Sequence, residues 1–102
     1  MTEIPKNFDE YPKLLEFSTR KDDIGIWEHP DGYTIEVTDG YRDAYYKITP
    51  TEVQLLNKVF GFKQDLDFIE SVKRVIKTKS GSHFYRALID NIKPEYTWIS
   101  GF

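Results

Sequence analysis

The chain has no cysteine, only two histidines and no long apolar run. Without cysteine it has no disulfide bond, no thiol nucleophile and no cysteine-based zinc site, which suits a reducing cytosol. No stretch approaches the roughly 20 apolar residues that cross a bilayer. The opening MTEIPKNFDE lacks the basic and apolar regions of a signal peptide. We therefore expect a cytoplasmic protein with no membrane segment.

Catalytic and cofactor motifs are also missing. The chain contains no Gly-x-Ser-x-Gly, His-Glu-x-x-His or EF-hand spacing. His29 stands in an expected turn and His83 near an expected helix start, and neither has a nucleophile or a metal-ligand partner at a useful spacing. Glu36 and Asp43 would share a solvated sheet face and repel each other mildly. We predict no enzyme activity, no metal and no cofactor.

Two turn motifs organise residues 24–48 into three alternating, strand-like runs. Asp39-Gly40 favours a two-residue type I′ turn, because Asp tolerates a positive φ and Gly prefers it. Such a turn pairs Thr38 with Tyr41 and places Gly40 in a left-handed conformation. These runs predict an antiparallel meander.

The first turn of the meander, His29-Pro30-Asp31-Gly32, leaves two alternatives open. A four-residue loop places Ile24 and Ile26 toward the core and Trp27 on the outer side, and a three-residue loop with a bulge reverses this. We prefer the four-residue loop because two isoleucines bury readily. Side chains alternate along a strand, so one side of the meander is then polar and aromatic: Thr34, Glu36, Thr38, Tyr41, Asp43, Tyr45 and Lys47.

Helical patterns flank the meander on both sides. Asp9 can cap a helix that fades by Ser18, and Thr49-Pro50-Thr51-Glu52 is a capping box for a second helix that ends at Gly61. Asp65 can open a third helix. Ser82 can cap a fourth helix, which spans residues 83–92.

The predicted fold class is α+β in a single domain, residues 1–102, with residues 1–8 as a flexible tail. An N-terminal helix precedes a three-stranded antiparallel meander, and three helices then pack on one sheet face. The aromatic tail, residues 95–102, either adds an edge strand or lies across the helices. One sheet face is expected to stay free of helices.

Charge is unevenly distributed, although the net charge is only −3. Residues 1–43 hold eleven acids and five bases, a net charge of −6, and the remaining residues have a net charge of +3. Such asymmetry marks either separate partner surfaces or complementarity between parts that pack together. Aromatic residues make up 16% of the chain, and aromatic side chains are enriched at protein interfaces.

The outer sheet side is the favoured protein-binding site, because aromatic anchors inside a polar rim are typical of binding hot spots. Its acids favour a basic protein partner. The alternative is that the first helix or the C-terminal tail covers this side as a second core layer. The candidate protein-binding residues are Trp27, Glu36, Tyr41, Asp43 and Tyr45.

Residues 73–86 carry the second candidate site, for nucleic acid or phosphate. Five bases occur there without an acid, and Ser80-Gly81-Ser82 adds backbone amides at a helix start. A dedicated nucleic-acid binder is usually basic overall, whereas this chain has a pI of about 5.3. The candidate residues are Lys73, Arg74, Lys77, Lys79 and Arg86.

Together these features predict a small, non-enzymatic interaction module that binds another protein as an inhibitor, adaptor or immunity-type factor. Phages and mobile elements commonly encode small soluble proteins of this kind, and this association suggests such an origin. Nucleic-acid binding through the basic segment is the alternative.

Overall fold

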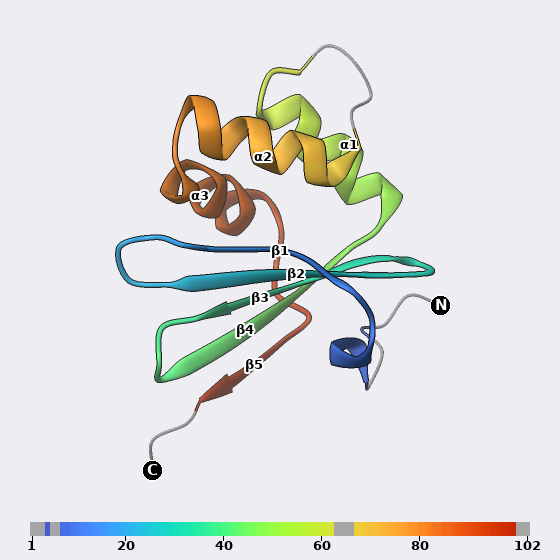
Figure 1. Ribbon diagram of the computed structural model, residues 1–102, viewed down its shortest axis with the longest axis vertical. Helices are drawn as coiled ribbons and strands as arrows, with labels where there is room; N and C mark the ends of the chain where they lie inside the picture. Colours follow the sequence, from blue (N-terminus) through green and yellow to red (C-terminus); the bar gives the residue numbers. More distant parts are fainter. Residues whose placement is uncertain (1–3, 5–6, 63–66, 100–102) are drawn as a thin grey trace.

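The computed structural model of the protein describes residues 4, 7–62 and 67–99, without the side chains of Tyr96, Trp98 and Ile99. Its described elements are a 3-10 turn, five strands and three helices (Figure 1). In chain order they are η1 (Phe8–Glu10), β1 (Lys13–Ser18), β2 (Asp23–His29), β3 (Gly32–Thr38), β4 (Arg42–Ile48), α1 (Pro50–Val59), α2 (Phe68–Thr78), α3 (Gly81–Asn91) and β5 (Tyr96–Ile99).

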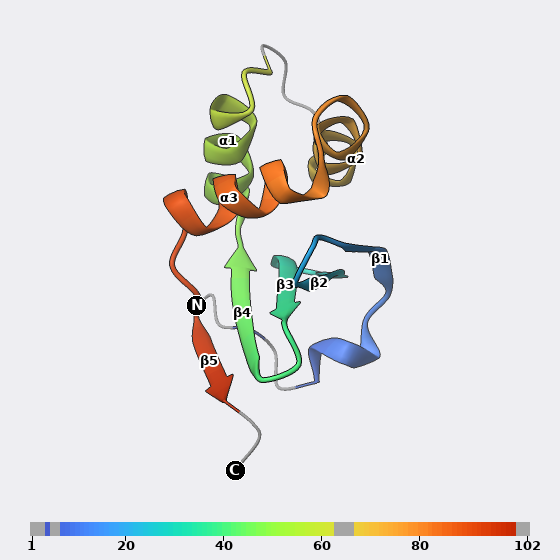
Figure 2. The same ribbon diagram turned by 90° about the vertical axis from the view of Figure 1, so that its left-hand side faces the viewer.

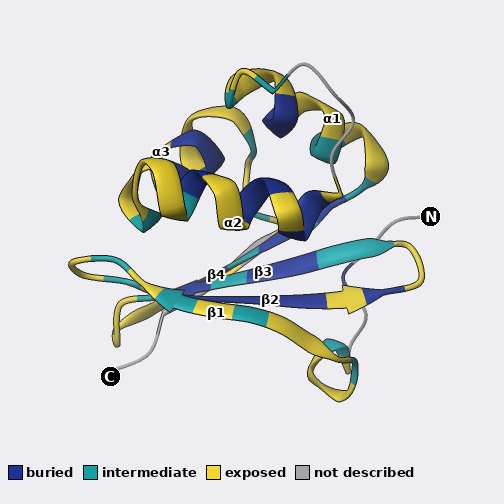
Figure 3. Cartoon of the chain, turned by 45° about the horizontal axis from the view of Figure 1, so that its top comes forward, coloured by how far each residue is buried: buried dark blue, intermediate teal, exposed yellow. Residues whose placement is uncertain are grey.

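The strands form one antiparallel sheet in the order β1-β2-β3-β4-β5, and each strand pairs with its neighbour in sequence. The three described helices lie together on one side of this sheet, and η1 lies on the other side (Figures 1 and 3). We call these the helix face and the outer face. The α+β class and the antiparallel sheet are confirmed.

The predicted N-terminal helix is wrong, because residues 13–18 form an edge strand beside β2. Leu15 pairs with Ile26 and Phe17 pairs with Ile24, so the side chains of Leu15 and Phe17 both lie on the helix face. A register shift between Lys13 and Leu15 places Leu14 in an irregularity, where it is 38% exposed. The apolar residues that suggested a helical stripe therefore belong to a bulged strand with period two.

The three-stranded meander is wrong in number, since β1 and β5 extend it on both edges. The aromatic tail pairs with β4, with Tyr96 opposite Tyr45 and Trp98 opposite Asp43 (Figure 2). This resolves the two alternatives for the tail in favour of an edge strand.

The turn between β3 and β4 also differs from the prediction. Thr38 pairs with Asp43, two residues beyond the predicted partner Tyr41. Gly40 has a φ of +93°, as predicted, but Asp39 does not have a positive φ, so the turn is not type I′. The Asp39 carboxylate accepts hydrogen bonds from the amides of Tyr41 and Arg42, each at 2.9 Å, and centres the loop on Gly40-Tyr41. These bonds hold the pKa of Asp39 below its ordinary value.

The first hairpin has a shorter loop than either alternative, because His29 pairs directly with Gly32. The preferred distribution of side chains is nevertheless present: Ile24 and Ile26 are buried in the core on the helix face, and Trp27 lies on the outer face.

Helix ends follow local capping chemistry. Thr49 and Glu52 form the predicted capping box of α1. Gly61, with a φ of +82°, ends α1 in a Schellman arrangement, in which its amide and that of Phe62 bond back to the helix carbonyls. Asp67 caps α2, which begins later than the predicted start at Asp65, a residue outside the described part.

Ser80, and not the predicted Ser82, caps α3 by accepting a hydrogen bond from the His83 amide at 3.0 Å. Position 81 is close to β1: a Cβ atom there would lie 3.1 Å from the Phe17 ring and 3.4 Å from the Ser18 carbonyl oxygen. Contact between the start of α3 and the end of β1 therefore replaces the open helix N-terminus that the sequence suggested for phosphate.

The core lies between the helices and the sheet. Phe84 of α3 is fully buried, and its ring lies within 5.7–6.4 Å of those of Phe17, Phe60 and Phe68. Ser71 of α2 donates a buried hydrogen bond to Asn57 of α1. Large aromatic side chains thus fill the core of a small domain.

Candidate functional site

The outer face is built by three strand-to-strand rows. The register places Gly25, Glu36 and Tyr45 in one row across β2, β3 and β4. Trp27, Thr34 and Lys47 form the next row, and Asp23, Thr38 and Asp43 form the third. Of the predicted protein-binding residues, this pairing brings Trp27, Glu36, Asp43 and Tyr45 to the same face.

Trp27 lies on this face but is covered, with only 8% of its surface exposed. The Phe8 ring from η1 packs edge-on against it at 5.1 Å and also contacts the Tyr45 ring at 5.5 Å. The Lys13 ammonium lies 4.7 Å from the centroid of the indole ring. The expected alternative, in which the N-terminal segment covers the face, is therefore realised over Trp27, although by a 3-10 turn instead of a helix.

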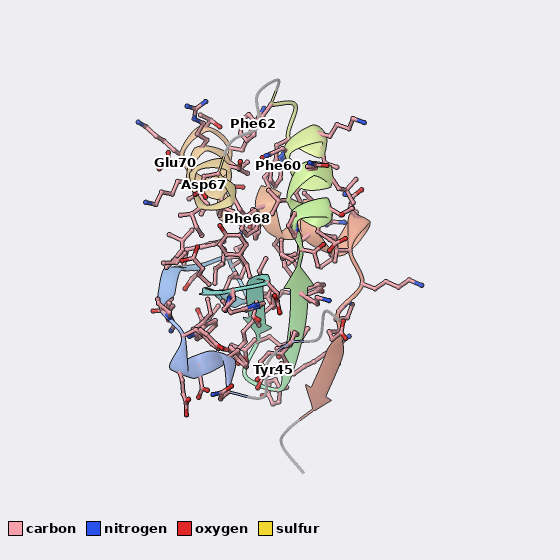
Figure 4. All side chains as sticks on the ribbon, turned by 90° about the vertical axis from the view of Figure 1, so that its right-hand side faces the viewer. Tyr45, Phe60, Phe62, Asp67, Phe68 and Glu70 are labelled. Atoms are coloured by element: carbon pink, nitrogen blue, oxygen red, sulfur yellow. The ribbon has the colours of Figure 1, made fainter. Side chains whose placement is uncertain are left out.

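Tyr45 and Glu36 form a half-buried polar pair beside this aromatic cluster. The Tyr45 hydroxyl donates a hydrogen bond to Glu36 Oε2 at 3.0 Å. Asp43 is half-buried one row away. Figure 4 shows Tyr45 on the sheet, at the end of the molecule remote from Phe60 and Phe62. The carboxylates of Glu36 and Asp43 thus flank an aromatic side chain that is accessible in part.

Tyr41 is not brought to the outer face by strand pairing, because it lies in the turn that ends the β3–β4 hairpin. It is 73% exposed, the largest value among the exposed large hydrophobic residues of the described chain. The sequence prediction that grouped Tyr41 with Tyr45 on one face depended on the two-residue type I′ turn and fails with it.

His29 occupies the far end of the outer face and is 5% exposed. Its Nε2 lies 3.1 Å from the Thr34 hydroxyl, and its buried Nδ1 has no hydrogen-bond partner in the described part of the chain. Burial lowers the pKa of His29 below its ordinary value of 6.5, and the nearby Asp31 carboxylate and the backbone of Tyr33 oppose this shift. The arrangement favours a neutral imidazole, because burial removes the charged form from water.

This burial predicts a stability change in mild acid. The unfolded chain binds a proton on His29 near pH 6.5, whereas the folded chain binds it only at lower pH. The free energy of unfolding should therefore decrease as the pH falls from 8 through 6.5. Urea unfolding of His29→Gln should show a smaller decrease than wild type. His83→Gln, at an exposed histidine, is the matched control and should keep the full decrease. An unchanged pH dependence in His29→Gln would show that His29 is not its source.

Acidic groups outnumber basic groups on the outer face. Lys13 forms an ion pair with Glu16 at 2.6 Å, the only ion pair among the described residues. Lys47 shares this side of the sheet with three further carboxylates, those of Asp23, Glu36 and Asp43. Four of the acids of residues 1–43, Glu16, Asp23, Glu36 and Asp43, thus lie on the face that carries no helix.

The second candidate site lies on α2, on α3 and between them. Lys73, Arg74 and Lys77 project from the exposed side of α2, Lys79 follows that helix, and Arg86 is exposed on α3. None of these five bases joins an ion pair in the described chain. The structure therefore separates a basic helix surface from an acidic sheet surface.

Phe8 and Ile4 are structural residues that sequence reasoning missed. Both fall in the segment predicted as a tail, yet Ile4 is 9% exposed and Phe8 covers Trp27. Tyr11 adds a ring contact with His29 at 6.0 Å. The available signal was four large apolar side chains, at positions 4, 8, 11 and 14, in an otherwise polar segment.

Comparisons of the chain with protein-family models, curated proteins and solved structures found no match. The described helices are all too short or too polar to cross a membrane. Among the described residues, no three histidine or acidic side chains are grouped in a way that could hold a metal ion. Functional inference therefore rests on the geometry of the two charged surfaces.

Proposed function

We propose that this protein is a cytoplasmic, non-enzymatic binding module that recognises a basic segment of another protein through its outer face. The observation that carries the proposal is the one-sided architecture, in which the described helices cover one sheet face and leave an acidic, aromatic face opposite (Figure 3). An inhibitor, adaptor or immunity-type factor works by such a surface alone.

The proposed contact surface runs from Tyr45 and Glu36 to Asp43 and the exposed Tyr41. Tyr45 and Tyr41 supply contact area, and the two carboxylates attract a basic partner and determine its orientation. Trp27 of β2 supports this surface, because it is buried under Phe8 and holds the Phe8 ring against the sheet. Aromatic anchors that are held in place before binding lose little conformational freedom on binding.

Nucleic-acid binding through the helix surface is a second candidate, favoured by the five exposed bases that lack acidic partners in the described chain. Glu70 and Asp67 at the start of α2 (Figure 4) weaken it, since both carboxylates would repel phosphates near Lys73 and Arg74. The overall pI of about 5.3 weakens it further.

Reciprocal charge reversals separate the two candidates. Glu36→Lys/Asp43→Lys should abolish capture of a protein partner from cell extract and should leave nucleic-acid retention unchanged. Lys73→Glu/Lys77→Glu should retain that partner, and both variants should keep the wild-type circular dichroism spectrum. Loss of the protein partner only in the helix variant would contradict the proposal. The second candidate would be established instead if the wild type retained nucleic acid in a salt-sensitive way and Lys73→Glu/Lys77→Glu did not.

A further inference from the structure

A cavity of about 290 Å³ lies on the helix face, at the end of the sheet that carries the β3–β4 turn. Val37 and Ala44 of the sheet form one apolar wall, and Ile89 of α3 and Pro94 form another. Pockets for small ligands begin at about 300 Å³, so this cavity suits a molecule of few heavy atoms and is too small for a nucleotide.

Tyr46 of β4 is the buried polar group of this cavity. It is 5% exposed and lines the cavity, and its side-chain hydroxyl makes no hydrogen bond with any residue that the structure describes. Nδ1 of His29 is the only fully enclosed side-chain nitrogen or oxygen without a hydrogen-bond partner in that part of the chain, so the Tyr46 hydroxyl keeps some accessible surface. A hydroxyl that lines a cavity and has no partner in the described part of the chain is available for contact with a ligand.

A second tyrosine and charges of both signs converge on the same cavity. Tyr85 of α3, Asp22, Asp39 and Arg42 all line it, and the Asp39 carboxylate already accepts hydrogen bonds from the backbone amides of Tyr41 and Arg42. Burial raises the pKa of the Tyr46 hydroxyl, Tyr85 and Asp22 raise it further, and Arg42 opposes them. Both tyrosines therefore stay protonated at neutral pH and can donate hydrogen bonds, and Asp22 and Arg42 both lie close enough to act on them.

We propose that this cavity binds a small zwitterion, an α-amino acid with an apolar side chain. Arg42 and the two tyrosine hydroxyls supply donors for its carboxylate, and Asp22 accepts from its ammonium group. Its side chain packs against the apolar walls. A carboxylate ligand without an ammonium group leaves Asp22 without a partner, and an amine without a carboxylate leaves the donors of Arg42 and the two tyrosines unused. The site lies on the helix face, so it is separate from the proposed protein-binding surface.

Calorimetric titration with three probes tests the charge pattern. L-leucine carries both charges, 3-methylbutylamine keeps only its ammonium group, and 4-methylpentanoate keeps only its carboxylate. Leucine should bind, and each single-charge probe should bind at least about tenfold more weakly, the effect of one lost charge-assisted hydrogen bond. The proposal would be overturned if the amine or the acid bound as tightly as leucine. It would also be overturned if leucine did not bind at about 10 mM, because small ligands reach at least that affinity in a built site.

Tyrosine-to-phenylalanine variants place the site on the chain. Tyr46→Phe keeps the ring and removes the hydroxyl, so leucine affinity should fall about tenfold while the melting temperature does not decrease. Tyr45→Phe is the matched control, because the side chain of Tyr45 points to the outer face and away from the cavity. This variant should bind leucine as the wild type does. Unchanged leucine affinity in Tyr46→Phe would exclude this cavity as the site.

Discussion

Gly32→Ala is expected to lower the free energy of unfolding by about 3 kcal/mol, the sum of backbone strain and a steric collision. Gly32 has a φ of +141°, where a side chain is strained. A Cβ atom there would lie 2.2 Å from the Ile48 carbonyl oxygen and 3.4 Å from Thr49 Cα. The collision would displace the junction between β4 and α1, where the Thr49 capping box begins the helical layer.

Gly40→Ala separates the two causes. Gly40 also has a positive φ, +93°, but nothing lies within 4 Å of a Cβ atom at that position. Its variant should therefore lose only the strain term, about 1 kcal/mol. Urea unfolding of both variants makes the comparison, and equal losses would show that close approach of the Ile48 carbonyl does not constrain residue 32.

Trp27→Ala is expected to cost about 3–5 kcal/mol, the usual effect of truncating a buried aromatic side chain. The ring contacts Phe8 and Lys13, and it covers Gly25, where a Cβ atom would lie 2.8 Å from the indole. Its loss would remove the support of η1 and expose the centre of the outer face. Thermal and urea unfolding would measure the change.

Tyr41→Ala is the matched control for Trp27→Ala, because Tyr41 is 73% exposed and should lose no more than about 0.5 kcal/mol. Tyr41→Ala should nevertheless weaken binding of the protein partner, although the domain stays folded. A Trp27→Ala variant as stable as Tyr41→Ala would show that the indole is not a structural support.

Sequence alternation predicted the two faces of the central strands correctly, even though the β3–β4 register was wrong. The error was two residues, because the Asp39 carboxylate captures the amides of Tyr41 and Arg42 and moves the loop centre. A shift of two residues keeps every side chain on its face, whereas a shift of one would reverse them. Ile35 and Val37 therefore remained in the predicted core.

The edge strands were harder to predict, since their conformation depends on partners distant in sequence. Leu14, Leu15 and Phe17 suit a helical stripe locally, and only pairing with Ile24 and Ile26 of β2 makes Leu15 and Phe17 alternate. Neighbouring cap residues caused smaller errors. Asp65 and Asp67, or Ser80 and Ser82, offer the same chemistry, and tertiary packing decides which residue caps its helix.

The two candidate sites differ in how far the sequence could reveal them. Glu36, Asp43 and Tyr45 share a face because of strand periodicity, which a sequence displays directly. The covering of Trp27 by Phe8 joins segments 19 residues apart, and periodicity carries no such information. The cavity around Tyr46 and Tyr85 depends on where α3 crosses the sheet, and only the assembled fold shows this.

Site-specific photo-crosslinking tests directly whether a protein partner binds the proposed contact surface, because the crosslink forms with whichever molecule contacts the substituted position. p-Benzoylphenylalanine would replace Tyr41 in the β3–β4 turn, at the end of the proposed contact surface, or, as the comparison, Lys77 on the basic helix surface. We expect a discrete crosslinked protein from position 41, which disappears when Asp43→Lys is added, and none from position 77. A discrete protein or nucleic-acid adduct from position 77 alone would contradict the account and place the working surface on the helices.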